Sequence, residues 1–362
     1  MVDMNYDILD IYSDYLIAQS HKATATGLSA LLAGSLSHDQ ITRFLNRPEL
    51  GSKALWNYVK PKVRELEQQT GGALIIDDSI EEKPYTDENA IVNWYFSHAK
   101  GKCVKGINLL SCLVRYGDVS LPIGFEIVHK DIHFFDLKTK KEKRRASVTK
   151  NDYFRQLTKQ AVQNQVQFEY VLADSWFGAS ANMEFIHHEL QKKFIFGLKT
   201  NRLVAFSEEE RKKGQYQSLS TINLKDGEAR KAYLKDLSLP VSLIKKILKN
   251  EDGSTGTLYL VTNDLNIDSD RIYEIYQKRW RIEEYHKSIK QNSSLEKSPT
   301  RTIRSQNNHL FASIIGYCKL EFLKITTCLN HFALKYKLIL KANQMAYLEL
   351  KKLRELGGGC VT

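Results

Sequence analysis

The sequence lacks long hydrophobic runs, paired cysteines and internal repeats. No run of about eighteen apolar residues occurs, so we expect no membrane-spanning helix. The N-terminal segment MVDMNYDILD is acidic and polar, which does not fit a signal peptide. No two cysteines have C-x-x-C spacing, which favours reduced thiols over a disulfide framework or a zinc site; the five are Cys103, Cys112, Cys318, Cys328 and Cys360. These absences predict a cytoplasmic protein.

Charge is the clearest compositional feature that is present. The 362 residues include 53 Lys and Arg against 42 Asp and Glu, which gives a formal net charge of +11. This excess favours a polyanionic partner such as nucleic acid, although a ribosomal or membrane-surface protein would have a similar balance. The length exceeds that of one ordinary domain, so we expect two or three modules.

Four polar residues recur at helical spacing in the segment RIYEIYQKRWRIEEYHKSIKQ. Tyr276, Arg279, Glu283 and Lys290 fall within about 60° of one another on a helix. A carboxylate flanked by two cations and a phenol suits a place where a metal ion meets phosphate. The alternative is a solvated charged face held by i,i+4 pairs. The other faces are expected to bury apolar side chains, namely Ile272, Ile275, Trp280, Ile282 and Ile289.

This pattern, Y-x2-R-x3-E-x6-K, resembles the Y-R-E-K box of DDE transposases encoded by bacterial insertion sequences. The resemblance implies that Glu283 is the third catalytic acid and that two aspartates precede it, each at the end of a hydrophobic strand. Asp77 follows Ala-Leu-Ile-Ile, and Asp174 follows Tyr-Val-Leu-Ala. The resemblance covers about residues 73 to 330. It implies an α/β fold with an RNase H-like catalytic core, a mixed β-sheet flanked by helices.

The family's three acids correspond to Asp77, Asp174 and Glu283, which we expect to converge on two Mg²⁺ ions. Carboxylates without His or Cys fit Mg²⁺ or Mn²⁺ better than Zn²⁺. Without metal, their mutual repulsion should raise their pKa values. Asp78 competes with Asp77 as the first ligand. Strand alternation allows only one of these two to face the site, and we favour Asp77 because Ser79 follows it by two residues, as in the family.

The same resemblance implies DNA contacts around the acids. Tyr276, Arg279 and Lys290 are expected to bind phosphates, the arginine through its planar fork. Trp176 either stacks on a base near the cleavage point or is a core or lid tryptophan. Some relatives stack a flipped base of a DNA hairpin on a tryptophan of their insertion. Residues 200–262 contain no tryptophan, so hairpin formation stays open.

The chain divides by pattern into five segments. Residues 1–70 predict several short helices, either a DNA-binding domain or a plain helical cap on the core. The remaining segments are 71–199, the first part of the core; 200–262, a β-rich insertion; 263–330, the rest of the core with the Y-R-E-K helix; and 331–362, a C-terminal helical segment. Within the core we expect strands at 73–77, 106–115, 119–128, 170–174 and 193–199, helices at 153–166 and 181–190, and an exposed basic loop at 136–150.

These observations favour a cut-and-paste transposase that binds terminal inverted repeats and target DNA and performs hydrolysis and strand transfer. We expect it to act as a homodimer on DNA and to associate with the bacterial nucleoid. Residues 332–356 are the candidate interface; the alternative is a helix that caps its own core. One alternative is an RNase H-like nuclease or resolvase that performs hydrolysis alone. The other is a catalytically inactive DNA-binding descendant.

Overall fold

The computed structural model describes residues 4–68, 71–98, 100–249 and 252–357. Cys360 lies outside the described residues. The chain forms two compact units, each described here by itself. One combines Met1–Leu50 with Tyr285–Thr362, and the other comprises Gly51–Glu284. We call them the helical unit and the sheet unit. Helix α9 (Arg281–Asn292) contains the boundary between them.

The helical unit is built around a long buried helix. Its helices besides the end of α9 are α1 (Met4–Ala18), α2 (Ala25–Leu31), α3 (His38–Leu45), α10 (Ile303–Thr327) and α11 (His331–Gly357). Tyr12 is fully buried, and its hydroxyl lies 3.0 Å from Nδ1 of His309 on α10. Ser37 caps α3, and Gln40 completes a reciprocal capping box.

The sheet unit contains the strands that carry the predicted aspartates. They are β1 (Ala73–Glu82), β2 (Val92–Ser97), β3 (Lys102–Tyr116), β4 (Val119–Ile127), β7 (Tyr170–Ala173) and β8 (Lys193–Leu198). Strand β1 pairs antiparallel with β3 and parallel with β7, while β3 pairs antiparallel with β4 and β7 parallel with β8. The resulting order, β4-β3-β1-β7-β8, is that of an RNase H-like core.

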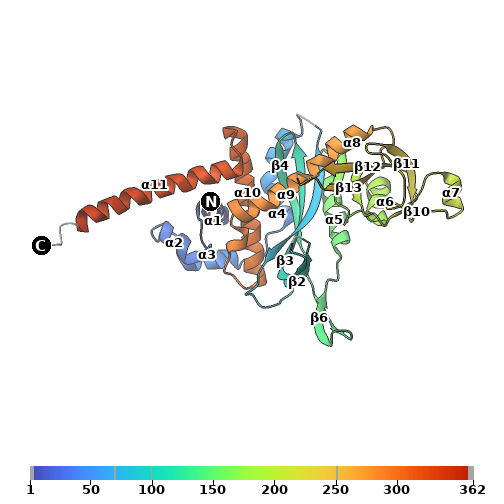
Figure 1. Ribbon diagram of the computed structural model, residues 1–362. Helices are drawn as coiled ribbons and strands as arrows, with labels where there is room; N and C mark the ends of the chain where they lie inside the picture. Colours follow the sequence, from blue (N-terminus) through green and yellow to red (C-terminus); the bar gives the residue numbers. More distant parts are fainter. Residues whose placement is uncertain (1–3, 69–70, 99, 250–251, 358–362) are drawn as a thin grey trace. The chain divides into compact units, whose positions relative to one another are not determined.

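Helices flank this sheet (Figure 1). They are α4 (Ser52–Leu66), α5 (Lys150–Gln163) and α6 (Ser180–Glu184) with the π-helical turn Phe185–Glu189. Helix α7 (Glu208–Lys212) lies instead in the later segment 200–262. Helix α4 packs on β4, where the Ser52 hydroxyl donates to the carbonyl of Phe125 and accepts from its N–H. By these contacts α4 belongs with the sheet, although the sequence pattern groups it with the N-terminal helices.

The segment 200–262 is β-rich, as expected, but its strands continue the core sheet. They are β9 (Leu203–Ala205), β10 (Gln217–Ser218), β11 (Ala229–Leu234), β12 (Val241–Lys249) and β13 (Thr255–Thr262). Strand β13 pairs antiparallel with β8, and β12, β11, β9 and β10 follow in order. Pairing with β13 satisfies the edge of β8, which the core pattern would otherwise leave open.

Two local predictions were wrong. Strand β2, whose exposed Trp94 and Phe96 alternate with less exposed residues, was not predicted. The segment 136–150, predicted as a loop, instead contributes to a hairpin of β5 (Ile132–Asp136) and β6 (Lys141–Arg145), followed by the start of α5. A run of lysines suppresses the apolar alternation by which strands are recognised, so this hairpin had no period-2 signal.

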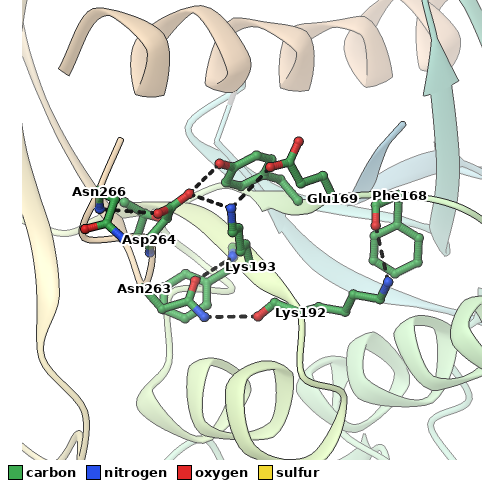
Figure 2. A network of polar contacts seen from close by, with 10 residues as sticks. Phe168, Glu169, Lys192, Lys193, Asn263, Asp264 and Asn266 are labelled. Carbon is green, nitrogen blue, oxygen red and sulfur yellow. Dashed lines mark hydrogen bonds and ion pairs between the residues drawn. The ribbon is translucent and has the colours of Figure 1, made fainter. Parts of the chain in front are cut away.

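A polar network fixes one end of the parallel strands (Figure 2). Asp264, just after β13, accepts a hydrogen bond of 2.7 Å from the Tyr170 hydroxyl and pairs with Lys193 Nζ at 2.8 Å. Asn263 accepts a hydrogen bond from the N–H of Phe194 and donates to the carbonyl of Lys192. Because β7 and β8 begin here, the network holds the register of both strands at the end opposite Asp174.

Helix α11 leaves most of its length uncovered. His331 and Lys335 are buried, but every described side chain from 341 to 355 is exposed. The exposed apolar residues are Phe332, Tyr336, Leu338, Leu340, Met345, Tyr347, Leu348, Leu350 and Leu353. Among the described residues, no helix combines the length and apolar character needed to cross a membrane.

Candidate active site

Asp77 is half-buried and lies in the middle of β1, not at the end of the strand as predicted. Its carboxylate accepts a hydrogen bond of 2.9 Å from the N–H of Asp78. Burial raises the pKa of Asp77 to about 7, and the negative charges of Asp174 and Asp78 add to this effect. Arg279 opposes the shift without cancelling it. The pKa of Asp77 is thus raised as predicted, although burial contributes more to the shift than repulsion between carboxylates.

Asp78 has a different environment. Its carboxylate pairs with Nζ of Lys150 at 2.9 Å and accepts a hydrogen bond from the side chain of Asn108. Successive strand residues point to opposite faces, and the two aspartates accordingly have separate partners. Asp77 lies beside Arg279, whereas Asp78 is neutralised by a lysine.

Asp174 follows β7 directly and organises the turn after it. Its Oδ1 accepts hydrogen bonds from the N–H groups of Trp176 at 2.9 Å and Phe177 at 3.4 Å. This Asx-type turn fixes the carboxylate at the end of the strand. The pairing of β7 with β1 then brings Asp174 close enough to Asp77 for electrostatic coupling.

Two glycines allow this turn to lie against β8. A Cβ added at Gly178 would lie 2.7 Å from the carbonyl oxygen of Gly197, and one added at Gly197 would lie 3.0 Å from the N–H nitrogen of Ser175 and 3.1 Å from the Tyr276 hydroxyl. The sequence analysis missed the role of Gly197. A glycine inside the strand pattern Lys-Phe-Ile-Phe-Gly-Leu was the available signal, since such a glycine marks close backbone approach.

Trp176 is partly exposed next to this turn. Its ring lies under Nζ of Lys150 at 4.2 Å and contacts the Phe177 ring edge-on at 4.9 Å between centroids. At 36% exposure it is not a core tryptophan, and one face of the indole already carries a cation.

The Y-R-E-K segment was predicted to be one continuous α-helix, but a 3₁₀ turn interrupts it. Helix α8 (Ser269–Gln277) ends at a 3₁₀ turn, Lys278–Trp280, before α9 begins. The tighter turn shifts the residues that follow it relative to an ideal helix. Trp280, expected on a buried face, is 40% exposed, whereas Ile272, Ile275, Ile282 and Ile289 are buried as expected.

Arg279 connects the first and third predicted acids. It is 8% exposed; Nη2 lies 3.0 Å from Oε1 of Glu283, and Nη1 lies 3.5 Å from Oδ2 of Asp77. Its buried Nε has no hydrogen-bond partner among the described residues. Tyr276 packs beside it with its ring centroid 5.7 Å from the guanidinium carbon, and burial raises the pKa of this phenol to about 12.

Lys290 is the one predicted site residue that belongs to the helical unit. There it pairs with Glu296 at 3.2 Å. The structure therefore brings together Asp77, Asp174, Tyr276, Arg279 and Glu283 in the sheet unit, with Trp176 on the adjoining turn.

We expected the three acids to converge on one point, but they do not. Within the described ranges, no group of three His, Cys, Asp or Glu side chains lies close enough to hold a metal ion. The physical reason is the position of Arg279, whose guanidinium pairs with both Asp77 and Glu283 and so separates the third acid from the first. The coupled pair of Asp77 and Asp174 does fit a divalent cation, because it offers hard oxygen ligands whose repulsion a cation would relieve.

Comparison with known families agrees with the fold. The chain matches the family described as DDE superfamily endonuclease over residues 4–221 and the family described as transposase DDE domain over residues 135–319. Each match covers more than half of the sequence. The chain therefore belongs to the DDE superfamily of endonucleases and transposases.

Other comparisons add little. No curated protein matches. Among solved structures, the Drosophila P element transposase strand transfer complex is similar at 11% identity and a TM-score of 0.25. That similarity covers 52% of this chain but only 36% of the other. It is too weak to bear on the site.

Proposed function

We propose that this protein cuts DNA at the ends of a mobile element and joins those ends to a target. The observation that carries the proposal is the coupling of half-buried Asp77 with Asp174 across the paired strands β1 and β7, beside a guanidinium that also holds Glu283. Carboxylates that repel one another and share a single cation are costly to desolvate and cluster at functional sites. In a DDE-family chain, the reaction they serve is phosphodiester cleavage.

Asp77 and Asp174 are the residues that would hold the first metal ion, and Glu283 would complete the set when Arg279 turns toward DNA. Bound Mg²⁺ supplies an activated nucleophile and charge neutralisation at the leaving oxygen. Before DNA binds, Arg279 provides the positive charge beside Asp77 and Glu283. Incoming phosphate competes for the same guanidinium, so DNA binding would release Glu283 for the metal site.

Arg279 is well suited to take a phosphate. Its buried Nε has no partner among the described residues, and its contact with Asp77 is long, which leaves donor capacity on one edge of the fork. Charge-assisted bidentate bonds to phosphate are among the stronger hydrogen bonds in proteins. Tyr276, buried and packed against the guanidinium, would position this arginine, and its hydroxyl would be a donor at the same place.

The proposed partners are duplex DNA with terminal inverted repeats, target DNA and a second copy of the chain. Joining two ends in concert requires two sites in fixed geometry, which a symmetric dimer supplies. The exposed apolar side chains of α11 support this helix as the interface, because apolar surface of that extent needs cover.

The decisive experiment supplies the protein with a duplex bearing the inverted repeats that flank its own gene, together with Mg²⁺, and maps the cut phosphates. Cleavage at the repeat boundary, followed by joining of pre-cut ends to a target plasmid, is expected. Cleavage without joining would favour the nuclease or resolvase alternative. DNA binding without cleavage in either Mg²⁺ or Mn²⁺ would favour the inactive descendant.

A further inference from the structure

The β5–β6 hairpin is a two-stranded sheet of its own. It does not pair with the large sheet, and in Figure 1 it projects from the sheet unit. Its strands align Ile132 with Arg145 at the base and Asp136 with Lys141 at the tip. Nothing in the candidate active site uses this element.

Both ends of the hairpin are restrained. At the base, Asp131 accepts hydrogen bonds of 2.9 Å from the N–H of Ser147 and 2.7 Å from its hydroxyl. At the tip, Asp136 accepts from the N–H groups of Lys138 and Thr139 at 2.9 and 3.2 Å. Isolated two-stranded hairpins are marginally stable in water. These restraints give the element a defined shape before any partner binds.

The charge of the hairpin is strongly positive and little of it is neutralised. Lys143 pairs with Asp136, and the Arg145 guanidinium lies 5.8 Å from the Phe134 ring. Within the described part of the chain, Lys138, Lys140 and Lys141 are exposed and form no ion pair. The three lysine side chains lie close in sequence and repel one another electrostatically. Binding of a polyanion would remove this repulsion.

Apolar side chains accompany these cations. Phe135 is 58% exposed and pairs across the hairpin with exposed Glu142, and Leu137 is 84% exposed in the turn that carries Lys138 and Lys140. A tip built only for solubility would be polar throughout. Cations flanking exposed apolar groups suit a ligand with a charged outer surface and a less polar interior.

Duplex DNA has that construction. Its major groove, about 12 Å wide, admits a two-stranded β-ribbon, phosphates line both rims, and thymine methyl groups offer apolar contact inside. Resting on the function proposed above, we propose that the β5–β6 hairpin inserts into the major groove of the DNA being processed. Lys138, Lys140 and Lys141 then contact phosphates, while Phe135 and Leu137 contact base edges.

The first test measures salt dependence. The variant Lys138→Gln, Lys140→Gln, Lys141→Gln is compared with a control of equal charge change, Lys212→Gln, Lys225→Gln, Lys235→Gln, whose lysines are also exposed but lie in the segment 200–262, outside the proposed DNA contacts and the proposed interface. Fluorescence anisotropy on the inverted-repeat duplex across a KCl series gives the log–log slope. We expect the hairpin variant to lose about two to three units of slope, at about 0.9 per lost phosphate contact, and the control to keep the wild-type slope.

The second test locates the groove. Dimethyl sulfate modifies guanine N7 in the major groove, and a five-residue strand of about 17 Å should protect about five base pairs. Phe135→Ala with Leu137→Ala should restore modification there. Unchanged protection in this variant, or an unchanged slope in the lysine variant, overturns the inference.

The same variants also test a membrane as the alternative ligand of the hairpin. A basic, aromatic hairpin could serve an anionic membrane surface instead, so both variants are also tested against vesicles containing phosphatidylserine. Loss of vesicle binding with unchanged DNA binding overturns the DNA assignment. If the wild type neither binds nor cuts the repeat, the proposed function itself fails. If the wild type cuts and the hairpin variants behave like the control, only this inference fails.

Discussion

The guanidinium of Arg279 lies 3.5 Å from the carboxylate of Asp77, although 202 positions separate them in the numbering of the chain. The same guanidinium holds Glu283 at 3.0 Å. One buried cation therefore supplies charge balance to two acids that the sequence analysis assigned to a metal site. The arrangement fits a resting state that metal and DNA together would reorganise.

Glu283→Gln tests whether this carboxylate is a metal ligand. The amide oxygen can still accept a hydrogen bond from Arg279, so the fold should persist, while a neutral oxygen is a poor Mg²⁺ ligand. We expect cleavage to fall by at least about a hundredfold, with repeat binding nearly unchanged. Cleavage is measured on labelled repeat DNA and binding by anisotropy. An equal loss of DNA binding would mean that the Arg279–Glu283 pair is structural.

Arg279→Ala tests the phosphate role. Binding of repeat DNA should weaken and the log–log salt slope should decrease by about one unit, as for one lost phosphate contact. Lys290→Ala should have the same effect. Urea unfolding of each variant is the control, because removing Arg279 also leaves Asp77 without its cation. A slope equal to that of the wild type would show that Arg279 serves only Asp77 and Glu283.

Gly178→Ala tests the close approach that positions Asp174. The added Cβ would lie 2.7 Å from a backbone oxygen of β8, so the turn must move, at a cost of about 1–3 kcal/mol in unfolding free energy. We expect a greater than tenfold loss of cleavage, because small displacements of catalytic groups are costly. Gly256→Ala on β13 is the matched control, since its Cβ would meet nothing within 4 Å. Equal activity in the two variants would contradict the positioning role.

Asp77 predicts a pH dependence of stability in the metal-free protein. Its pKa is raised from 3.8 to about 7 in the folded state, so the folded protein binds the extra proton between these values. The stabilisation is complete below about pH 4 and is lost as pH rises through about 7, with a slope of at most about 1.4 kcal/mol per pH unit. Urea unfolding at several pH values should show this slope in the wild type and a reduced one in Asp77→Asn. Identical pH profiles would contradict the raised pKa.

Truncation tests the α11 interface. Lys335 donates hydrogen bonds to the carbonyls of Ile17 and Gln19, so the helix is needed up to that point. Removing residues 341–362 should therefore preserve folding and single-end binding but prevent formation of a complex that holds two ends, as seen on native gels. A truncated protein that still pairs two ends would rule out this interface while leaving the dimer itself possible.

The sequence by itself determined the local contexts of the acids. Each aspartate follows a run of buried apolar residues, and Ala73–Ile76 and Tyr170–Ala173 are indeed fully or nearly fully buried strands. Glu283 stands four residues after Arg279, and such a pair meets on a helix whatever else surrounds it. The RNase H-like order of strands and helices follows from the same patterns, because hydrophobic periodicity is a local property.

Only the tertiary structure decided which groups meet. Pairing of β1 with β7 couples Asp77 to Asp174, and the buried position of Arg279 links Glu283 to Asp77 rather than leaving three acids around one point. The sequence also did not predict that the sheet continues from β8 into β13 or that β5 and β6 form a basic hairpin. Strand partners, buried charges and close glycine contacts depend on residues distant in sequence, so no local pattern encodes them.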